Sequence, residues 1–344
     1  CSVNSLYLFH RKNLYKNELL VKLLKMKILV IQNRMGIGDM VIFLPFIKAI
    51  SKKFNSSVSI LVKENSKADQ ILKDTNYIDQ IIFLKRNKKH KDEHDGISGF
   101  FRLSEVIKKN NFDKVFIFNS SLRFRLICKL AKINEIYQYP LFEKKNQHIT
   151  EAPRKLLLKN FNIDILENPK IEIDKKKVET IYKKFNFLND TKYFLLGIGG
   201  SGPTKRVPAN KYLELMKYCK ESYKCKFFIA TGKNTEEQKI LKEILNVYKE
   251  DCVALDNLSI YETMPIIKNC SLAVCNDTSF SHISSALNIP TIVLMCDTPL
   301  IYGSYSTNMY PILPDGVDSV THGTQGKENI NPREIFKKLS SILG

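Results

Sequence analysis

The sequence predicts an α/β protein with two domains, each built around a parallel β-sheet. Its 344 residues are enough for two domains of about 150 residues each. Short apolar runs alternate with segments of helical periodicity, which is typical of parallel strands whose sheet is covered by helices on both faces. This alternation occurs in two series, and a charged stretch at about 163–190 separates them.

The first series begins at Met26. We expect strands where short apolar runs stop at polar or turn residues, at 27–32, 57–62, 80–85 and 113–118. Helices are expected at 39–54, 65–73, 99–109 and 121–132. The first of these helices opens with an acidic residue and ends with basic ones, as the helix dipole favours. The charged run at 85–96 is expected to form a surface loop.

The second series follows the charged stretch. It predicts strands at 193–199, 226–231, 271–275 and 291–295, with helices at 209–220, 235–247, 260–269 and 281–287. A closing helix is expected from about residue 331. The chain therefore divides into an N-terminal extension, two domains and a C-terminal helix, with predicted bounds 1–25, 26–165, 166–330 and 331–344.

Charge and composition narrow the possible partners. The chain is 44% hydrophobic and 26% charged, as expected of a globular protein. Its 54 Lys and Arg against 35 Asp and Glu give a net charge of +19, which favours phosphorylated substrates, anionic lipid or nucleic acid. The chain is also rich in Lys, Asn and Ile, which have A/T-rich codons, so genome composition is an alternative explanation for part of the positive charge. We expect no nucleic-acid partner, because the basic residues are spread out and no nucleic-acid-binding motif is present.

Cysteine spacing and hydropathy predict a cytoplasmic protein. The eight cysteines form no C-x-x-C pair and have no zinc-ligand spacing, so we expect reduced thiols and no metal site. No run of 18 apolar residues exists, so no membrane-spanning helix is expected. Residues 1–25 carry too many charges for a signal peptide. They are either upstream translated sequence or a basic amphipathic helix that touches a membrane.

The first motif, NRMGIGDM at 33–40, lies between the first predicted strand and helix. Gly36 and Gly38 permit a tight turn and a close approach of the backbone to a ligand. Asp39 falls at the carboxyl end of a parallel strand, where open α/β sheets bind ligands. Two roles for Asp39 stay open: a cap of the following helix or a catalytic base.

The second motif, GIGGSGPTKRVP at 197–208, also follows a predicted strand. Its glycine-dense loop offers backbone N–H groups, and Lys205 and Arg206 add positive charge. An anion-binding loop for a diphosphate explains this pattern better than a simple turn. The candidate phosphate-binding residues in the loop are Gly199, Gly200, Ser201, Lys205 and Arg206.

The third motif, NDTS at 276–279, precedes a helix that contains His282. A helix N-terminus offers unpaired N–H groups and a positive partial charge, so a phosphate can bind at Thr278 and Ser279. Asp277 would repel that phosphate unless it orients a loop or contacts a hydroxyl group. His282 either reaches a phosphate oxygen or has a structural role.

The order of these three motifs resembles glycosyltransferase family 9, the ADP-heptose:lipopolysaccharide heptosyltransferases. The similarity extends from about Met26 to the end of the chain. The chain resembles the opening pattern of the family at LVIQNRMGIGDMVIFLP and its middle pattern at GIGGSGPTKRVPANKYLELM. It resembles the late pattern, which is the most specific of the three, at DTSFSHISSALNIP. The resemblance implies a GT-B fold, with two Rossmann-like domains and parallel sheets facing a central cleft. The N-terminal domain would bind the acceptor and the C-terminal domain the nucleotide sugar.

The resemblance also implies roles for single residues. Asp39 matches the proposed general base of the family, and Lys205 matches a basic residue near the donor phosphates. Asp277, Thr278, Ser279 and His282 match the phosphate-binding turn with its acidic residue and its downstream histidine. Val207 replaces an aromatic residue, and Ser279 replaces a glycine. A glutamate that would hold the nucleotide hydroxyls has no certain counterpart; Asn234 and Glu236 are the candidates.

These matches imply an inverting glycosyltransferase without a required metal or other cofactor. It would transfer a heptose or similar sugar from a nucleotide diphosphate sugar, expected to be ADP-heptose, to a lipopolysaccharide or lipooligosaccharide core. The acceptor would be an anionic glycolipid or core oligosaccharide, reached by peripheral contact with the inner membrane. Lys52, Lys53, Arg123 and Arg125 are basic residues that either meet such an acceptor or remain solvated. A same-fold transferase with another donor and an inactive sugar-nucleotide or glycan-binding protein remain alternatives.

Overall fold

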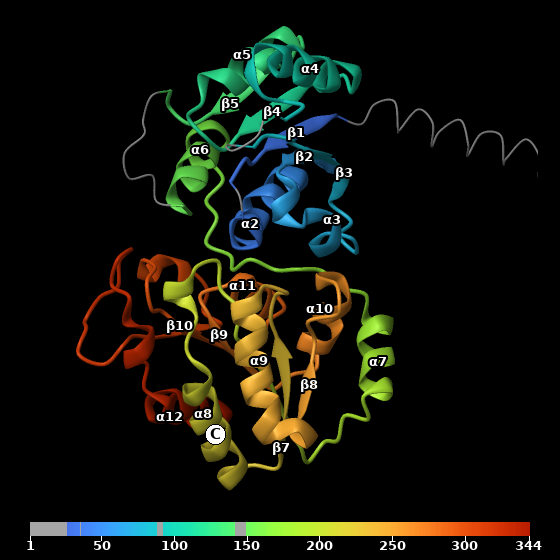
Figure 1. Ribbon diagram of the computed structural model, residues 1–344. Helices are drawn as coiled ribbons and strands as arrows, with labels where there is room; N and C mark the ends of the chain where they lie inside the picture. Colours follow the sequence, from blue (N-terminus) through green and yellow to red (C-terminus); the bar gives the residue numbers. More distant parts are fainter. Residues whose placement is uncertain (1–25, 35, 88–91, 142–148) are drawn as a thin grey trace, which may run out of the picture.

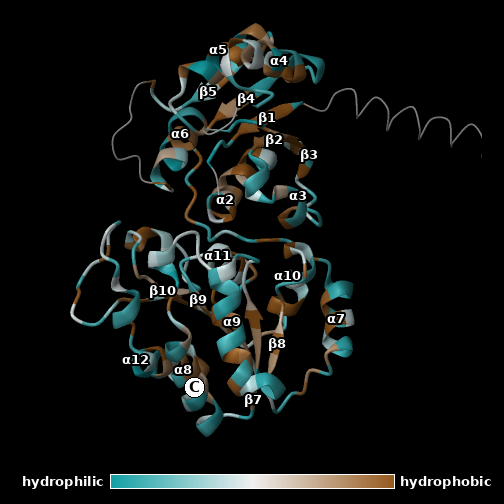
Figure 2. Cartoon of the chain, in the orientation of Figure 1, coloured by the Kyte–Doolittle hydropathy of each residue, from teal (hydrophilic) through white to brown (hydrophobic). Residues whose placement is uncertain are grey.

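The computed structural model describes residues 26–34, 36–87, 92–141 and 149–344. It consists of two α/β lobes, one above the other in Figure 1, joined by a segment that crosses between them. Strands rich in apolar residues run through the inside of each lobe, and polar residues mark the outward parts of most helices (Figure 2). The two-domain α/β fold class predicted from the sequence is confirmed.

The first lobe contains a five-stranded parallel sheet with the strand order β3-β2-β1-β4-β5. Its strands are β1 (Ile28–Ile31), β2 (Val58–Val62), β3 (Ile78–Phe83), β4 (Lys114–Ile117) and β5 (Glu135–Gln138). Its helices are α2 (Ile37–Phe54), α3 (Ala68–Ile71), α4 (Gly96–Lys109), α5 (Leu122–Leu130) and α6 (Glu151–Phe161), with a 3₁₀ turn η1 (Glu64–Ser66).

Alternation along β1 divides the helices of this lobe into two layers. Ile28 and Val30 pack in the same cluster as α2, α3 and α6, on the face toward the second lobe. Leu29 and Ile31 point to the opposite face, where α4 and α5 cover the sheet. The helices α4 and α5 therefore form the end of the molecule farthest from the second lobe (Figure 1).

The second lobe contains a six-stranded parallel sheet with the order β11-β10-β9-β6-β7-β8. Its strands are β6 (Lys192–Gly197), β7 (Cys225–Ala230), β8 (Cys252–Ala254), β9 (Leu272–Asn276), β10 (Thr291–Leu294) and β11 (Met309–Ile312). Its helices are α7 (Lys175–Lys184), α8 (Ala209–Ser222), α9 (Thr235–Tyr248), α10 (Ile260–Lys268), α11 (Ser279–Ala286) and α12 (Pro332–Leu343). Four 3₁₀ turns complete it: η2 (Pro203–Lys205), η3 (Lys249–Asp251), η4 (Leu300–Gly303) and η5 (Gly326–Asn329).

Both sheets have a topological switch point, between β1 and β4 in the first lobe and between β6 and β9 in the second. The chain leaves these neighbouring strands in opposite directions along the sheet, which opens a crevice at their carboxyl ends. The loops after β1 and β6 carry the first two glycine motifs. The fold therefore places both motifs where an open α/β sheet binds its ligand.

The structure adds elements that the sequence pattern did not predict. The strands β5, β8 and β11 are short and lie at or near sheet edges, and α7 has no fully buried residue. The run 85–96 is not wholly a surface loop among its described residues, because His94 is buried and its Nδ1 accepts a hydrogen bond from the Lys85 N–H.

No described helix is both long and apolar enough to cross a bilayer. The seven described cysteines are free thiols, and the predicted extension 1–25 lies outside the described residues.

Polar contacts hold the two lobes together on one side. The carboxylate of Asp74, which follows α3, accepts hydrogen bonds from Lys177 Nζ at 2.8 Å and from the Tyr261 hydroxyl at 3.0 Å. It also accepts the backbone N–H of Asp174 at 3.0 Å. Because these donors come from α7, α10 and the segment before α7, one carboxylate connects the first lobe to three parts of the chain beyond it.

We expect Asp74→Ala to lower the free energy of unfolding by about 2 kcal/mol, because three donors lose a charged acceptor. The matched control is Asp190→Ala, since Asp190 pairs with Lys224 on the exposed surface, where such pairs contribute less than about 1 kcal/mol. Urea denaturation of both variants measures the difference. Equal losses for the two variants would show that Asp74 does not connect the lobes as described.

Candidate active site

A cleft of about 750 Å³ lies where the carboxyl ends of the two sheets meet. Its walls come from the segments after β1 and β2 in the first lobe and after all six strands of the second. Almost all residues that the sequence singled out line it together: Gly36, Gly38, Asp39, Gly199, Gly200, Ser201, Lys205, Arg206, Asn234, Asp277, Thr278, Ser279 and His282. Glu236 is exposed and is not among the residues that line the cleft.

Asp39 is held at the start of α2, but it does not occupy the cap position itself. Gly36 is the N-cap residue, and its N–H donates to the Asp39 carboxylate at 3.1 Å. Arg34 lies 3.6 Å from the other carboxylate oxygen, and the Asp39 side chain remains 21% exposed. The two roles left open by the sequence are therefore compatible, because the carboxylate stabilises the helix start and still lines the cleft.

Gly38 brings the first lobe into close contact with the second. A Cβ atom built on Gly38 would lie 2.5 Å from ring atoms of His282, which belongs to α11. Such a distance is shorter than any normal contact, so a side chain at this position would force the two lobes apart. The glycine is required for this close approach of the lobes.

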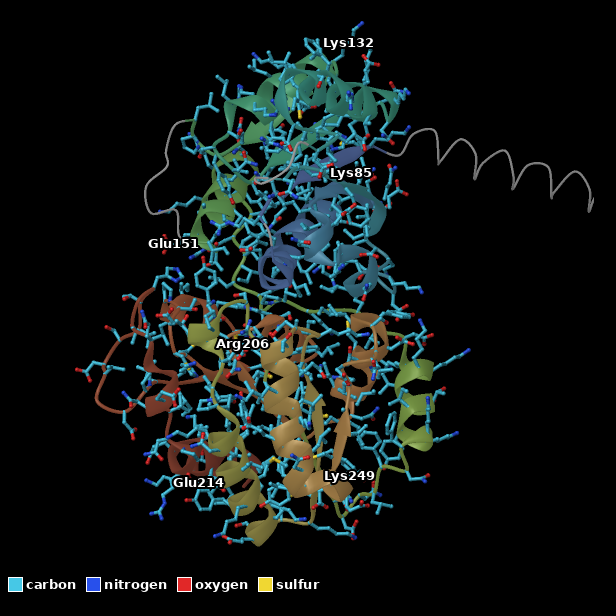
Figure 3. All side chains as sticks on the ribbon, viewed as in Figure 1. Lys85, Lys132, Glu151, Arg206, Glu214 and Lys249 are labelled. Atoms are coloured by element: carbon cyan, nitrogen blue, oxygen red, sulfur yellow. The ribbon has the colours of Figure 1, made fainter. Side chains whose placement is uncertain are left out.

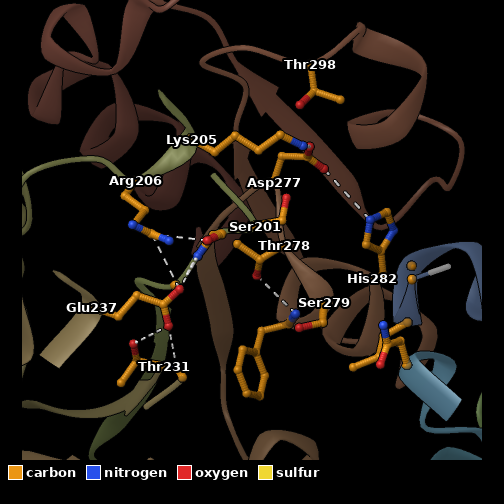
Figure 4. A pocket seen from close by; sticks show the side chains of 18 of the residues that line it. Ser201, Lys205, Arg206, Thr231, Glu237, Asp277, Thr278, Ser279, His282 and Thr298 are labelled. Carbon is orange, nitrogen blue, oxygen red and sulfur yellow. Dashed lines mark hydrogen bonds and ion pairs between the residues drawn. The ribbon is translucent and has the colours of Figure 1, made fainter. Parts of the chain in front are cut away.

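A chain of polar contacts crosses the second-lobe wall of the cleft (Figure 4). Lys205 Nζ lies 2.9 Å from Asp277 Oδ2, and His282 Nε2 lies 3.8 Å from Asp277 Oδ1. On its other side, His282 Nδ1 is 2.8 Å from the hydroxyl of Tyr305, whose ring stacks on the imidazole. Burial raises the pKa of Asp277, but the neighbouring His282 and Lys205 lower it further, so its net pKa lies below the ordinary value. Asp277 is therefore ionised at neutral pH.

Burial favours the neutral form of the His282 ring. Burial lowers its pKa below 6.5, and the carboxylates of Asp277 and Asp39 oppose this effect without reversing it. A neutral imidazole carries one proton. When Nδ1 accepts a hydrogen bond from the Tyr305 hydroxyl, that proton is on Nε2, which faces Asp277. Tyr305 was not identified from the sequence, because no motif marks it.

A second buried carboxylate, Glu237, joins the loops after β6 and β7. It accepts hydrogen bonds from the Gly200 N–H at 3.0 Å, the Gly232 N–H at 2.6 Å and the Thr231 hydroxyl at 3.2 Å. Arg206 Nε lies 3.5 Å from the same carboxylate and donates to the Gly200 carbonyl at 3.1 Å. In Figure 3, Arg206 lies at the edge of the second lobe that faces the first. Glu237 therefore shapes the glycine loop and neutralises one of its cations.

The two candidates predicted from the sequence for the nucleotide hydroxyls, Asn234 and Glu236, lie close to Glu237 along the chain, and both are exposed. Asn234 caps α9, and its side-chain oxygen accepts the N–H of Glu237 three residues later. The N-cap residue and the residue three positions later have the spacing typical of a helix start. The carboxylate of Glu237 itself accepts hydrogen bonds from the neighbouring loops, and no motif in TGKNTEEQ marks those partners.

The N-terminus of α11 forms the centre of the cleft wall. Its first N–H groups have no partner within the helix, and the Thr278 hydroxyl accepts one of them, the N–H of Phe280, at 3.1 Å. Together with the helix dipole, this end favours a bound anion.

Val207, which stands where the family has an aromatic residue, is fully buried in the core of the second lobe. The replacement therefore affects packing behind the glycine loop. No described residues form a cluster of three or more potential metal ligands.

The chain is similar to known proteins in both sequence and fold. The sequence model of glycosyltransferase family 9 (heptosyltransferase) matches residues 101–310. A lipopolysaccharide heptosyltransferase 1 of Campylobacter coli is 24% identical over an alignment with a length of 357, which covers 93% of this chain and 99% of that protein.

Two solved structures share the fold along almost the whole chain. The glycosyl transferase family 9 protein of Veillonella parvula aligns with a TM-score of 0.75 at 17% identity, covering 92% of this chain and 97% of that one. The E. coli heptosyltransferase WaaC with ADP-2-deoxy-2-fluoro heptose aligns with a TM-score of 0.67 at 15% identity, covering 92% and 99%. These matches confirm the GT-B architecture.

We expect Gly38→Ala to destabilise the protein by about 1–3 kcal/mol, because the added methyl group overlaps the His282 ring. Gly36→Ala is the matched control, since the nearest atom to its new Cβ would be 3.5 Å away. Thermal unfolding of the two variants tests this. Similar midpoints for both would contradict a tight contact at Gly38.

Glu237→Gln is expected to lower the free energy of unfolding at pH 7 by about 2 kcal/mol, because the loops lose a charged acceptor. Burial raises the pKa of Glu237, but its hydrogen bonds lower it further, to below 4.5. The contribution of the Glu237 carboxylate to the free energy of unfolding is therefore full above pH 4.5, and it is lost as the pH falls through the lowered pKa.

Denaturation of wild type and variant across this pH range measures the effect. Glu236→Gln, one residue away and exposed, is the control and should change stability by less than about 0.5 kcal/mol. A stability difference that persists unchanged at pH 2 would contradict the assigned role of the Glu237 charge.

Proposed function

The chain belongs to glycosyltransferase family 9, and from this we propose that it transfers a heptose from ADP-heptose to a lipopolysaccharide or lipooligosaccharide core with inversion at the anomeric carbon. One observation carries the proposal. A single cleft places the carboxylate of Asp39, from the first lobe, opposite Lys205 and the α11 N-terminus of the second lobe. A base and an anion-binding wall on two sides of one cleft are what transfer from a nucleotide sugar requires.

The second-lobe wall would hold the donor. Its diphosphate would bind at the N-terminus of α11 and beside Lys205, with Arg206 and the Gly200 loop nearby. The carboxylate of Asp277, paired with Lys205, would accept hydrogen bonds from sugar hydroxyls and not meet the phosphates directly. Asn234 lines the cleft and remains the candidate for the nucleotide hydroxyls, whereas the exposed position of Glu236 does not favour that role. The complex of the E. coli relative with an ADP-heptose analogue supports the choice of donor.

The reaction would be a direct displacement. The acceptor hydroxyl attacks the anomeric carbon from the face opposite the diphosphate, while Asp39 accepts the hydroxyl proton as a general base. The bond to the diphosphate breaks, and the leaving group gains negative charge. Lys205, Arg206 and the N–H groups at the start of α11 stabilise that charge more strongly as it develops. These groups supply the positive charge, so the proposal requires no metal or cofactor.

The acceptor would approach from the first lobe as an anionic glycolipid or core oligosaccharide. The net charge of +19 and the name of the Campylobacter coli relative support this class of acceptor. We place the reaction in the cytoplasm, with peripheral contact to the inner membrane. A transferase of the same fold with another nucleotide sugar, or an inactive binding protein, would differ in a product assay.

We expect Asp39→Asn to lower kcat by about 10²- to 10⁴-fold with little change in the KM for the donor, because only proton transfer is lost.

Lys205→Gln is expected to lower kcat by about 10²- to 10³-fold, because the negative charge that develops on the leaving group is no longer stabilised. Asp79→Asn, an exposed carboxylate on β3, serves as the control.

Mass spectrometry of products from purified protein, a lipid-linked core acceptor and a panel of nucleotide sugars provides the readout. Full activity of Asp39→Asn would require another base. Transfer from a different nucleotide sugar alone would reject ADP-heptose as donor, and absence of turnover with every donor would indicate a binding protein.

A further inference from the structure

The outer end of the first lobe exposes large apolar side chains on two neighbouring helices, α4 and α5. Figure 1 places these helices at the end of the molecule farthest from the second lobe. Their exposed apolar residues are Ile97 (80% exposed), Phe101 (54%), Leu122 (40%), Leu126 (44%) and Leu130 (46%). Single exposed leucines are common in soluble proteins, but five large apolar side chains on two adjacent helices are not.

The helix α5 is apolar on both its inner and its outer side. Phe124, Ile127 and Cys128 are buried against the sheet. Leu122, Leu126 and Leu130 recur every fourth residue, so they lie above one another on the outward side. A surface helix of a soluble protein normally presents polar residues outward. In Figure 2 both helices carry apolar colouring at this end of the lobe.

Arg123 joins the apolar residues of the two helices into one surface. Its guanidinium donates to the backbone carbonyls of Gly96 at 2.9 Å and His94 at 3.0 Å, and it lies 5.5 Å from the centre of the Phe100 ring. The first turn of α5, with Leu122, is therefore pinned beside the first turn of α4, with Ile97. Arg123 thus has a structural role, and it is not a freely solvated cation available to an acceptor.

Cations surround these apolar residues. Residues 96–132 contain eight Lys and Arg but only two acidic residues, Glu105 and Asp113. Within the part of the chain that the structure describes, only Lys114 of the eight forms an ion pair with a carboxylate, that of Glu135, and Arg123 binds backbone carbonyls. The other six pair with no described carboxylate: Arg102, Lys108, Lys109, Arg125, Lys129 and Lys132. On α5, the helical period places Arg125 and Lys129 along one flank of the leucines. Lys132 projects from the outer end of the lobe (Figure 3).

We propose that this surface binds an anionic phospholipid bilayer. We call it the α4–α5 face and define it by Ile97, Phe101, Leu122, Leu126 and Leu130 with the cations Arg102, Arg125, Lys129 and Lys132. The apolar side chains would enter the boundary between headgroups and acyl chains, while the cations would meet the phosphates. Apolar residues flanked by lysine and arginine are typical of helices that lie in a membrane interface.

The distribution of charge favours a bilayer over a protein partner. Unpaired cations lie beside the leucines and at the ends of both helices, which fits an extended plane of negative charge. The proposed function gives this contact its use, because a lipid-anchored acceptor is reached at the membrane. The binding itself is independent of sugar transfer, since the α4–α5 face contributes no residue to the cleft.

The chain contains no tryptophan, so a single introduced tryptophan reports on its own surroundings. We would introduce Leu126→Trp on the α4–α5 face and, as the matched control, Leu188→Trp in the second lobe, where the side chain is 52% exposed. Both full-length variants are mixed with vesicles of phosphatidylethanolamine and phosphatidylglycerol, or of phosphatidylcholine alone. We expect a blue shift at position 126 with the anionic vesicles only, quenching there by brominated acyl chains, and no change at position 188.

Charge reversal tests the electrostatic part. Arg125→Glu combined with Lys129→Glu is expected to weaken binding to the anionic vesicles by about tenfold or more, measured by co-sedimentation. Lys239→Glu combined with Lys242→Glu, at exposed positions of α9, makes the same change in net charge and should weaken binding far less.

Four outcomes would overturn the proposal. The first is no sedimentation with anionic vesicles, and the second is sedimentation without a change at position 126. The third is an equal loss of binding in both charge variants. The fourth is a blue shift at position 126 that follows protein concentration without vesicles, which would assign the face to contact between copies of the chain. Transfer to a water-soluble core oligosaccharide, measured in the same variants, tests the proposed function separately.

Discussion

The buried carboxylate of Asp277 is the constraint on which the cleft depends. A charge in such a position is stable only when it is paired and hydrogen-bonded. Lys205 supplies the charged partner, and His282 lies beside the carboxylate with Tyr305 behind it. The same His282 ring meets Gly38 of the first lobe, so the side chain beside Asp277 is also a point of close approach between the lobes. His282 thus links the second-lobe wall of the cleft to the loop that precedes α2 in the first lobe.

Glu237 has a parallel role on the neighbouring loops. It pairs with Arg206 and accepts the N–H groups of Gly200 and Gly232, so two flexible glycine segments have a fixed shape. Preorganised donors stabilise a developing charge with little reorganisation at the moment of reaction. Two buried carboxylates therefore position the two cations that would face the leaving diphosphate. The outer α4–α5 face has an opposite character, since its four cations pair with no carboxylate among the described residues.

Much of this arrangement was predictable from the sequence. The main strands and helices follow from apolar periodicity, and the three motifs converge because carboxyl ends of parallel strands meet at one edge of each sheet. The elements that were missed have weak signals: β8 has three residues, and α7 has a polar sequence with no buried residue. Asp277 looked unfavourable beside a phosphate because its partner Lys205 lies 72 residues away in sequence. Glu237 was overlooked in favour of Glu236 because the orientation of a side chain on a helix depends on where that helix begins.

The most direct measurement is a crystal structure of the chain with an ADP-heptose analogue bound. We expect the diphosphate within hydrogen-bonding distance of Lys205 Nζ and the first N–H groups of α11, with the anomeric carbon facing Asp39 across the cleft. A diphosphate bound away from α11, or an anomeric carbon turned away from the first lobe, would contradict the assignment of base and donor site.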